Sequence, residues 1–279
     1  MAYKSIFLHW DESEPATARF DLAARLASRY GAHVTVLCVG IAPEPPMMMY
    51  GGYAVDLVTQ NLDDIREATD ALAAKARTKL EEAGILGESR AVVTTASTLA
   101  RVIGGLTRYA DLIVVGQPYG APDEDLLIQV LEGALFDGGS AVLVSPNKPV
   151  HSIGDQAIVA WNASREALAA TRAALDFLKE STRTEILLVD PDSGPFSEGP
   201  EPGADIALLL ARHGVDVTVS RFASAGRPIG EVLKTHVLDA GADLLVMGAY
   251  GHSRFREFVL GGATRTILKD VPVPVLMAH

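Results

Sequence analysis

The sequence is poor in cysteine and in long apolar runs. Its 279 residues contain one cysteine, Cys38, and the apolar run around it, Val34 to Val39, predicts a buried, inert thiol rather than a redox centre. The longest apolar stretches, such as Val271 to Ala278, are much shorter than the roughly 20 residues needed to cross a bilayer. Because the N-terminus shows no signal peptide, we expect a cytoplasmic protein without a membrane partner.

Basic residues are also scarce. Lys plus Arg total 24 against 35 Asp plus Glu, a formal net charge of -11. Such a surface repels a phosphate backbone, so the sequence argues against DNA or RNA as a partner. Hydrophobic side chains make up 48% of the residues, which predicts one or two globular domains.

Common catalytic and phosphate-binding motifs are absent as well. The sequence has no Gly-x4-Gly-Lys-Ser/Thr loop and no Gly-x-Gly-x-x-Gly turn. It also has no Gly-x-Ser-x-Gly, His-Glu-x-x-His or Cys-x-x-Cys sequence. Nothing in it therefore predicts an enzyme.

One pattern occurs twice along the chain. Residues 6–13 and 158–164 both read as a strand followed by Trp, then Asp or Asn, any residue and Ser. Two further matches follow in the same order, 110–116 with 242–248 and 141–144 with 274–277. The sequence therefore predicts two copies of one domain, residues 1–146 and 154–279, joined by a proline-containing linker.

Within each copy, short β-branched runs alternate with segments of helical period. This pattern predicts an α/β fold of two Rossmann-like domains, each a five-stranded parallel sheet in the order 3-2-1-4-5 flanked by helices. Ser13 and Ser164 are predicted N-caps of helices over Glu14–Tyr30 and Arg165–Lys179. The predicted strands are 3–9, 32–40, 90–95, 111–116 and 141–145, then 155–161, 183–190, 215–221, 243–248 and 273–278.

Spaced glycines follow the fourth strand of the second copy. Gly248, Gly251 and Gly261 are separated by two and nine residues, and a helix is expected from about Thr264. Glycine lets a ligand approach the main chain, and the first N–H groups of a helix favour an anion. Ligands of open parallel sheets bind beyond the carboxyl ends of the strands where the strand order reverses, which here places Asn162 opposite the glycines.

These motifs resemble the universal stress proteins in a tandem two-domain form, over essentially the whole chain. The resemblance depends on the Asp-x-Ser or Asn-x-Ser after each first strand, on Gly226-Arg227-Pro228, on the Ala-Asp-Leu strands, and on the Gly248-x2-Gly251-x9-Gly261 spacing. It implies a stress-response protein that binds ATP or AMP, with no catalytic residues and at most weak, incidental ATP hydrolysis. It also implies pairing of the fifth strands, 141–145 and 273–278, as an intramolecular pseudo-dimer, with a homodimer as a further form.

The resemblance also implies which residues bind the nucleotide. Val189 would meet the adenine through its backbone, Asn162 would lie near the adenosine, and Met247, Gly248 and Gly251 would line the ribose and phosphates. Gly261, Gly262, Ala263 and Thr264 would hold phosphates. His252 and Arg254, in the nine-residue spacer, either reach the phosphates or only solvate the loop.

The chain departs from the family pattern in two ways. Asn162 stands where the family commonly has Asp, and Gly262 where it has Ser or Thr, so we expect reduced affinity. The first copy lacks the glycine spacing after Gly116 and instead has three carboxylates at 123–125. Because carboxylates disfavour an anion, we expect this copy to be free of nucleotide.

Some interpretations stay open at the level of sequence. Asn162 either contacts ribose or forms a turn, and Asp190 and Asp192 either hold Mg²⁺ near phosphates or form a turn. The Pro- and Met-rich loop at 42–53 is either a hydrophobic lid or an adaptable binding surface. If it is a binding surface, the protein could be a nucleotide-free interaction scaffold.

Overall fold

The structure is a computed structural model that describes residues 3–44, 52–120, 123–191, 199–249 and 262–279. It divides into two compact units. The N-terminal unit consists of Tyr3–Gly116 and Asp123–Ser140, and the C-terminal unit consists mainly of Gln117–Pro122 and Ala141–His279. The segment from Gln117, which belongs to the first sequence repeat, is thus part of the second unit.

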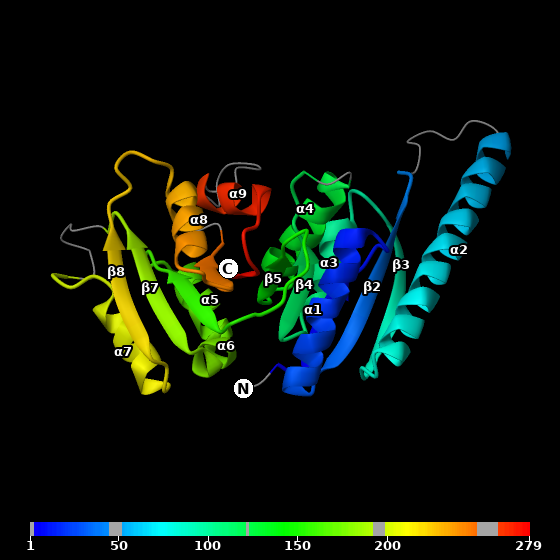
Figure 1. Cartoon of the computed structure of the whole chain (residues 1–279). Coiled ribbons are helices and arrows are strands. Elements are labelled where there is room, and N and C mark those ends of the chain that lie inside the picture. The colour runs from blue at the N-terminus through cyan, green and yellow to red at the C-terminus, as the bar shows by residue number, and fades with distance from the viewer. Residues whose placement is uncertain (1–2, 45–51, 121–122, 192–198, 250–261) are drawn as a thin grey trace. The chain divides into compact units, whose positions relative to one another are not determined.

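The N-terminal unit is a parallel sheet with flanking helices (Figure 1). Its strand order is β3-β2-β1-β4, with β1 hydrogen-bonded to both β2 and β4. The strands are β1 Ser5–His9, β2 His33–Ala42, β3 Gly87–Thr95 and β4 Leu112–Gly116. The helices are α1 Glu14–Tyr30, α2 Gly52–Glu82, α3 Leu99–Thr107, α4 Glu124–Glu132 and the π-helical turn η1 Gly133–Asp137.

The C-terminal unit has the strand order β5-β10-β9-β6-β7-β8. Its last five strands reproduce the predicted order 3-2-1-4-5 as β8-β7-β6-β9-β10, and all four of their pairings are parallel. The strands are β5 Val142–Ser145, β6 Gln156–Ala160, β7 Arg183–Val189, β8 Val217–Phe222, β9 Leu244–Gly248 and β10 Val275–Ala278. The helices are α5 Arg165–Ala173, α6 Leu175–Glu180, α7 Ala204–Arg212, α8 Ile229–Asp239 and α9 Gly262–Lys269.

Strand β5 pairs with β10 in the antiparallel direction. Val144 lies opposite Val275, and Val142 lies opposite Met277. The fifth strand of the first repeat therefore lies in the C-terminal unit, beside the fifth strand of the second repeat. By this division the predicted linker, 146–154, lies within the C-terminal unit.

The two predicted N-caps are present. Ser13 Oγ accepts a hydrogen bond from Ala16 N at 3.2 Å, and Ser164 Oγ accepts one from Ala167 N at 3.1 Å. Helix α1 has the predicted bounds, but the helix predicted over 165–179 is divided at Ala174 into α5 and α6. The Met-rich part of the loop predicted at 42–53 lies outside the described residues.

Apolar strand residues form the core of each unit. Ile6, Leu8 and Val114 are fully buried in the first, and Val246 and Leu276 are fully buried in the second. Cys38 is a free, buried cysteine, as predicted, and burial together with the charge of Asp11 raises its pKa to about 12. In the described parts of the chain, no helix combines the length and apolar composition needed to span a membrane.

Candidate functional site

The candidate site lies at the carboxyl ends of three neighbouring strands, β7, β6 and β9. Ala160, the last residue of β6, lies opposite Leu187 of β7 and Met247 of β9. The strand order reverses between β6 and β9, because the chain goes from β6 to β7 on one side and returns to β9 on the other. This switch point is where open parallel sheets bind ligands.

Asn162 follows β6 at this edge and forms a turn. Its Oδ1 accepts a hydrogen bond from Ser164 N at 3.3 Å, and Ala163 between them has a φ of 58°. Ser164 then caps α5, so the turn directs the chain from strand to helix. Of the two roles that the sequence left open for Asn162, the turn is the one that the structure shows.

Gly248 ends β9 against the first turn of α5. A Cβ added at Gly248 would lie 2.5 Å from Ala167 N and 2.7 Å from the carbonyl carbon of Glu166. Both neighbours are backbone atoms, so only glycine permits this approach of helix and strand. Met247, the preceding residue, is 5% exposed.

Val189 and Asp190 lie at the end of β7. Val189 is half-buried, and Asp190 has a φ of 47°. Asp190 Oδ1 accepts a hydrogen bond from Ser224 N at 2.9 Å, and bonding to Ser224 lowers the pKa of this carboxyl. Asp190 therefore joins the end of β7 to the residues after β8, and Asp192 lies outside the described residues. Among the described residues, no group of three or more His, Cys, Asp or Glu could hold a metal ion.

Gly262, Ala263 and Thr264 form the first turn of α9, two residues earlier than the predicted start. Gly262 is exposed, and a Cβ added there would meet no heavy atom within 4 Å. Thr264 is 4% exposed, and the fully described first turn has no acidic residue. This helix end can therefore accept an anion. The predicted contacts Gly251, His252, Arg254 and Gly261 lie outside the described residues.

In the first copy, an arginine covers the corresponding strand end. Arg19 of α1 is 2% exposed, and a Cβ added at Gly116, the counterpart of Gly248, would collide with its Nη1. Arg19 Nε donates to His9 O at 2.8 Å, and Nη2 donates to Asp11 Oδ2 at 3.3 Å. The guanidinium therefore places a positive charge inside the protein, at the end of β4.

The buried arginine changes the titration of its neighbours. Burial, with the charge of Arg19, lowers the pKa of His9 to about 4, so that this imidazole is neutral at pH 7. Burial alone would raise the pKa of Asp11, but hydrogen bonds from Ser13 and the charge of Arg19 hold it below its usual value. At neutral pH the cluster is one ion pair beside a neutral histidine.

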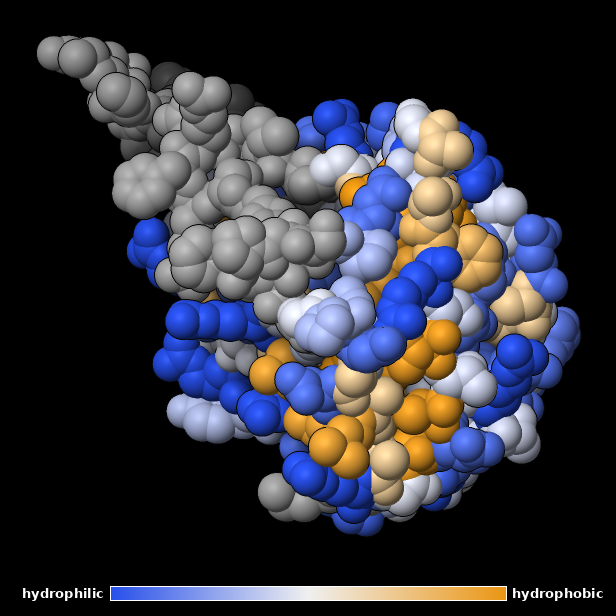
Figure 2. Space-filling model, turned by 90° about the vertical axis from the view of Figure 1, so that its left-hand side faces the viewer, coloured by the Kyte–Doolittle hydropathy of each residue, from blue (hydrophilic) through white to orange (hydrophobic). Residues whose placement is uncertain are grey.

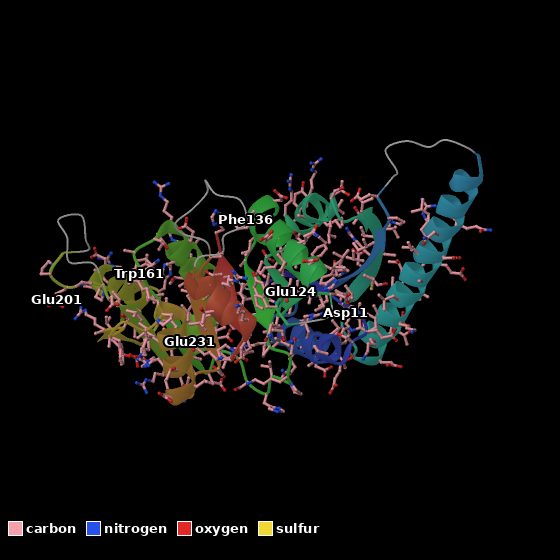
Figure 3. All side chains as sticks on the ribbon, turned by 90° about the horizontal axis from the view of Figure 1, so that it is seen from above. Asp11, Glu124, Phe136, Trp161, Glu201 and Glu231 are labelled. Carbon is pink, nitrogen blue, oxygen red and sulfur yellow. The ribbon has the colours of Figure 1, made fainter. Side chains whose placement is uncertain are left out.

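Helix α4 also differs from its counterpart α9. Its first turn contains Glu124 and Asp125, and Figure 3 labels Glu124 at the start of this helix. These carboxylates lie where an anionic ligand would otherwise interact with the helix dipole. The first copy has its own glycine pair, Gly138 and Gly139, but the pair follows α4 and η1 instead of preceding a helix.

Sequence reasoning missed Arg19. Aligning Ser13 with Ser164 places Arg19 opposite Ala170, which is fully buried. A long cationic side chain in one copy, at a position where the other copy has alanine, is a sequence signal that could have identified Arg19. Both tryptophans that follow the first strands are buried, Trp10 at 1% and Trp161 at 9% exposure. Figure 3 labels Trp161, after β6, and Asp11, which accepts a hydrogen bond from Ser13 N after β1.

Comparisons with known proteins agree with the repeat and the fold. Residues 154–279 match the model of the universal stress protein family. Universal stress protein Slr1230 from Synechocystis sp. (strain ATCC 27184 / PCC 6803 / Kazusa) is 26% identical over 296 residues, covering 98% of this chain and 99% of the relative.

Two solved structures share the fold over the whole length. A universal stress protein from Archaeoglobus fulgidus DSM 4304 has a TM-score of 0.74 at 20% identity, covering 100% of this chain and 96% of that one. A functionally unknown protein from Pseudomonas aeruginosa PAO1 has a TM-score of 0.58 at 12% identity, covering 99% and 92%.

The α/β unit occurs twice, and the strand order of the second unit reverses between β6 and β9. This arrangement defines a protein of two Rossmann-like domains. Residues 154–279, somewhat less than half of the chain, match the universal stress protein family, and the chain is similar to universal stress proteins over its whole length. Its similarity to Slr1230 over nearly the full length of both chains fits the tandem two-domain form.

Proposed function

We propose that the C-terminal unit binds an adenine nucleotide, ATP or AMP, and that the protein is a regulatory module of the stress response without catalytic turnover. The contrast between α9 and α4 carries the proposal. The first turn of α9 is open and uncharged at Gly262, whereas that of α4 contains its own carboxylates, Glu124 and Asp125. Of these two helices, α9 is therefore the one whose first turn has no carboxylate of its own, so its N–H groups and positive dipole end favour phosphate.

The position of α9 supports the same proposal. Figure 1 shows this helix at the end of the sheet toward which the arrows of β7 and β8 point. The glycine spacing from Gly248 to Gly261 would bring the chain from β9 to the start of α9, as the resemblance implies. Adenine is the expected base because Val189 and Asn162 stand at the adenosine positions of the family, with Asn162 in place of the common Asp.

Calorimetry with ATP, AMP and adenosine tests the proposal, together with mass spectrometry of any nucleotide released on denaturation. We expect ATP or AMP to bind in one site per chain. Two sites per chain would contradict the assignment of a single site to the C-terminal unit, and no binding would overturn the proposal. In that event, the interaction scaffold that uses the 42–53 loop becomes the better hypothesis.

A turnover assay tests the regulatory part of the proposal. At saturating ATP, we expect ADP or AMP to appear far more slowly than the roughly 1–1000 per second of typical enzymes. Multiple rapid turnovers would show that the protein is an enzyme.

A further inference from the structure

Helix α9 is held at its C-terminal end by a residue of the first sequence repeat, Gln117. Its Nε2 donates to Lys269 O, the last carbonyl of α9, at 3.0 Å, and its Oε1 accepts a hydrogen bond from Val271 N at 3.1 Å. The same Nε2 lies 3.1 Å from Tyr119 O. One amide thus satisfies the carbonyl of Lys269, which helix geometry leaves without a partner, and the N–H of Val271 just after the helix.

Tyr119, two residues later, contacts the exposed side of the same helix. It is 7% exposed, and the guanidinium of Arg265 lies 6.0 Å from the centre of its ring. An arginine over an aromatic face at this distance is a favourable cation–π contact. The segment Gln117–Tyr119 therefore holds α9 at two places.

Other contacts of α9 come from its own repeat. Ile267 and Leu268 are fully buried, and a Cβ at Gly230 of α8 would lie 2.5 Å from the Cβ of Thr266. Lys234 of α8 forms an ion pair with Asp270, just after α9. These contacts fix the side of α9 that faces α8, whereas Gln117 fixes its C-terminal end.

The position of Gln117 in the repeat indicates its role. It directly follows Gly116, as Ala249 follows Gly248 in the second copy, where the spaced glycines begin. In the first copy, the segment after Gly116 lacks the glycine spacing. The same segment contacts α9, the helix that follows the spaced glycines in the second copy.

We propose that Gln117–Tyr119 is a positioning element of the C-terminal nucleotide site. It fixes the axis of α9, so that the N–H groups at Gly262 and Ala263 stay aimed at the phosphates. A group held in its bound geometry loses less entropy on binding, and affinity rises accordingly. This inference depends on the proposed function, because it concerns how tightly the same site holds a nucleotide.

The full-length Gln117→Leu variant tests the proposal by calorimetry with ATP and adenosine. Leu removes the hydrogen bonds by replacing the polar amide with an apolar side chain of similar size. Because couplings between sites typically change affinity about 5- to 150-fold, we expect roughly ten-fold weaker binding of ATP. We expect adenosine, which has no phosphate, to bind with unchanged affinity.

The matched control is Ser140→Ala. It removes one buried hydrogen bond, from Ser140 Oγ to Thr107 O at 2.9 Å in the N-terminal unit, and should leave both affinities unchanged. If Gln117→Leu does not fold, Tyr119→Leu removes the ring under Arg265 and should weaken ATP binding in the same direction. Unchanged ATP affinity in the Gln117 variant, or an equal loss for ATP and adenosine, would overturn the positioning role.

Amide exchange of α9 separates this inference from the proposed function. Gln117→Leu should speed exchange in α9 relative to the wild-type chain, and unchanged exchange would contradict the proposed hold on the helix. If the wild-type chain binds no nucleotide, the proposed function fails and so does the effect on affinity. The exchange measurement would then still decide whether Gln117 holds α9.

Discussion

Replacing Gly262 with aspartate tests the phosphate-holding role of α9 with little disturbance of its packing. Gly262 is exposed at the start of the helix, and an added Cβ would have open space around it. A carboxylate near a helix N-terminus typically stabilises by about 0.3–1 kcal/mol. We therefore expect Gly262→Asp to unfold at the same temperature as the wild type or slightly above it.

The same carboxylate should strongly disfavour a phosphate. Two unit charges 4 Å apart interact by about 1 kcal/mol in bulk water and about 4 kcal/mol at an effective dielectric constant of 20. Because Gly262 is exposed, the lower value applies. Repulsion of about two phosphate charges then costs roughly 2 kcal/mol, which is a loss of about thirty-fold in affinity.

Calorimetry with ATP on three variants measures this effect. Gly262→Asn, of the same shape but uncharged, is the matched control and should bind much as the wild type does. Gly262→Ser restores the hydroxyl that is common at this position in the family, and should bind more tightly. Gly262→Asp and Gly262→Asn with equal affinities, in proteins of equal thermal stability, would refute a phosphate site at the start of α9.

Three further predictions concern stability. Gly104→Ala should cost about 1–3 kcal/mol in urea unfolding, since its Cβ would lie 2.8 Å from a backbone carbon of Asp137. Gly105 lies in the same helix with open space around its Cβ position, so Gly105→Ala should raise the free energy of unfolding by about 0.5–1 kcal/mol. Stability changes of the same sign in both variants would contradict the packing of α3. Burial lowers the pKa of His9 from 6.5 to about 4, so that on acidification the unfolded chain binds a proton before the folded chain does. The free energy of unfolding should therefore fall by about 3 kcal/mol as the pH falls from 6.5 to 4. The His9→Leu variant should lose that part of the pH dependence. A variant whose free energy of unfolding depends on pH as the wild type's does would contradict the role of His9. Asp11→Asn leaves the guanidinium of Arg19 buried without its carboxylate partner. Because Asp11 is partly exposed, this should lower the free energy of unfolding in urea by at most about 3 kcal/mol. An unchanged free energy of unfolding would argue against the ion pair.

Local signals predicted much of the fold. Ser13 fixes the start of α1, and Gly31, in the left-handed region with a φ of 59°, fixes its end, so both bounds could be read from nearby residues. The division between α5 and α6 could not, because Ala174 is a good helix former. At Ala174 the tertiary structure overrides local propensity.

The surface of the C-terminal unit also carries features that sequence patterns do not predict. Leu208 of α7, Phe222 of β8 and Leu238 of α8 are between 41% and 53% exposed. Figure 2 shows apolar side chains gathered over the face that contains β8. Periodicity identifies apolar positions but does not show which of them the neighbouring elements leave uncovered.

At the candidate site, one sequence pattern can have more than one physical cause. A glycine at the end of a strand can allow close packing or leave backbone free for a ligand, and the two roles have the same sequence signature. For Gly248 the structure shows the close packing of α5 on the strand. The contacts of Gln117 were not predictable from local pattern, because it bonds to residues 152 and 154 positions away.

The two copies differ in how the charge at the site is compensated. In the first copy, Asp11 neutralises the buried guanidinium of Arg19, and Glu124 and Asp125 interact with the dipole of α4. In the second copy, the position of Arg19 is taken by Ala170, and α9 has no carboxylate in its first turn. In the proposal, the positive end of α9 therefore interacts with an external anion, whereas the first copy supplies its own carboxylates. We expect a nucleotide to compete with protein charges in the first copy but not with carboxylates of the first turn of α9, so electrostatics and the glycine spacing both favour a single site per chain.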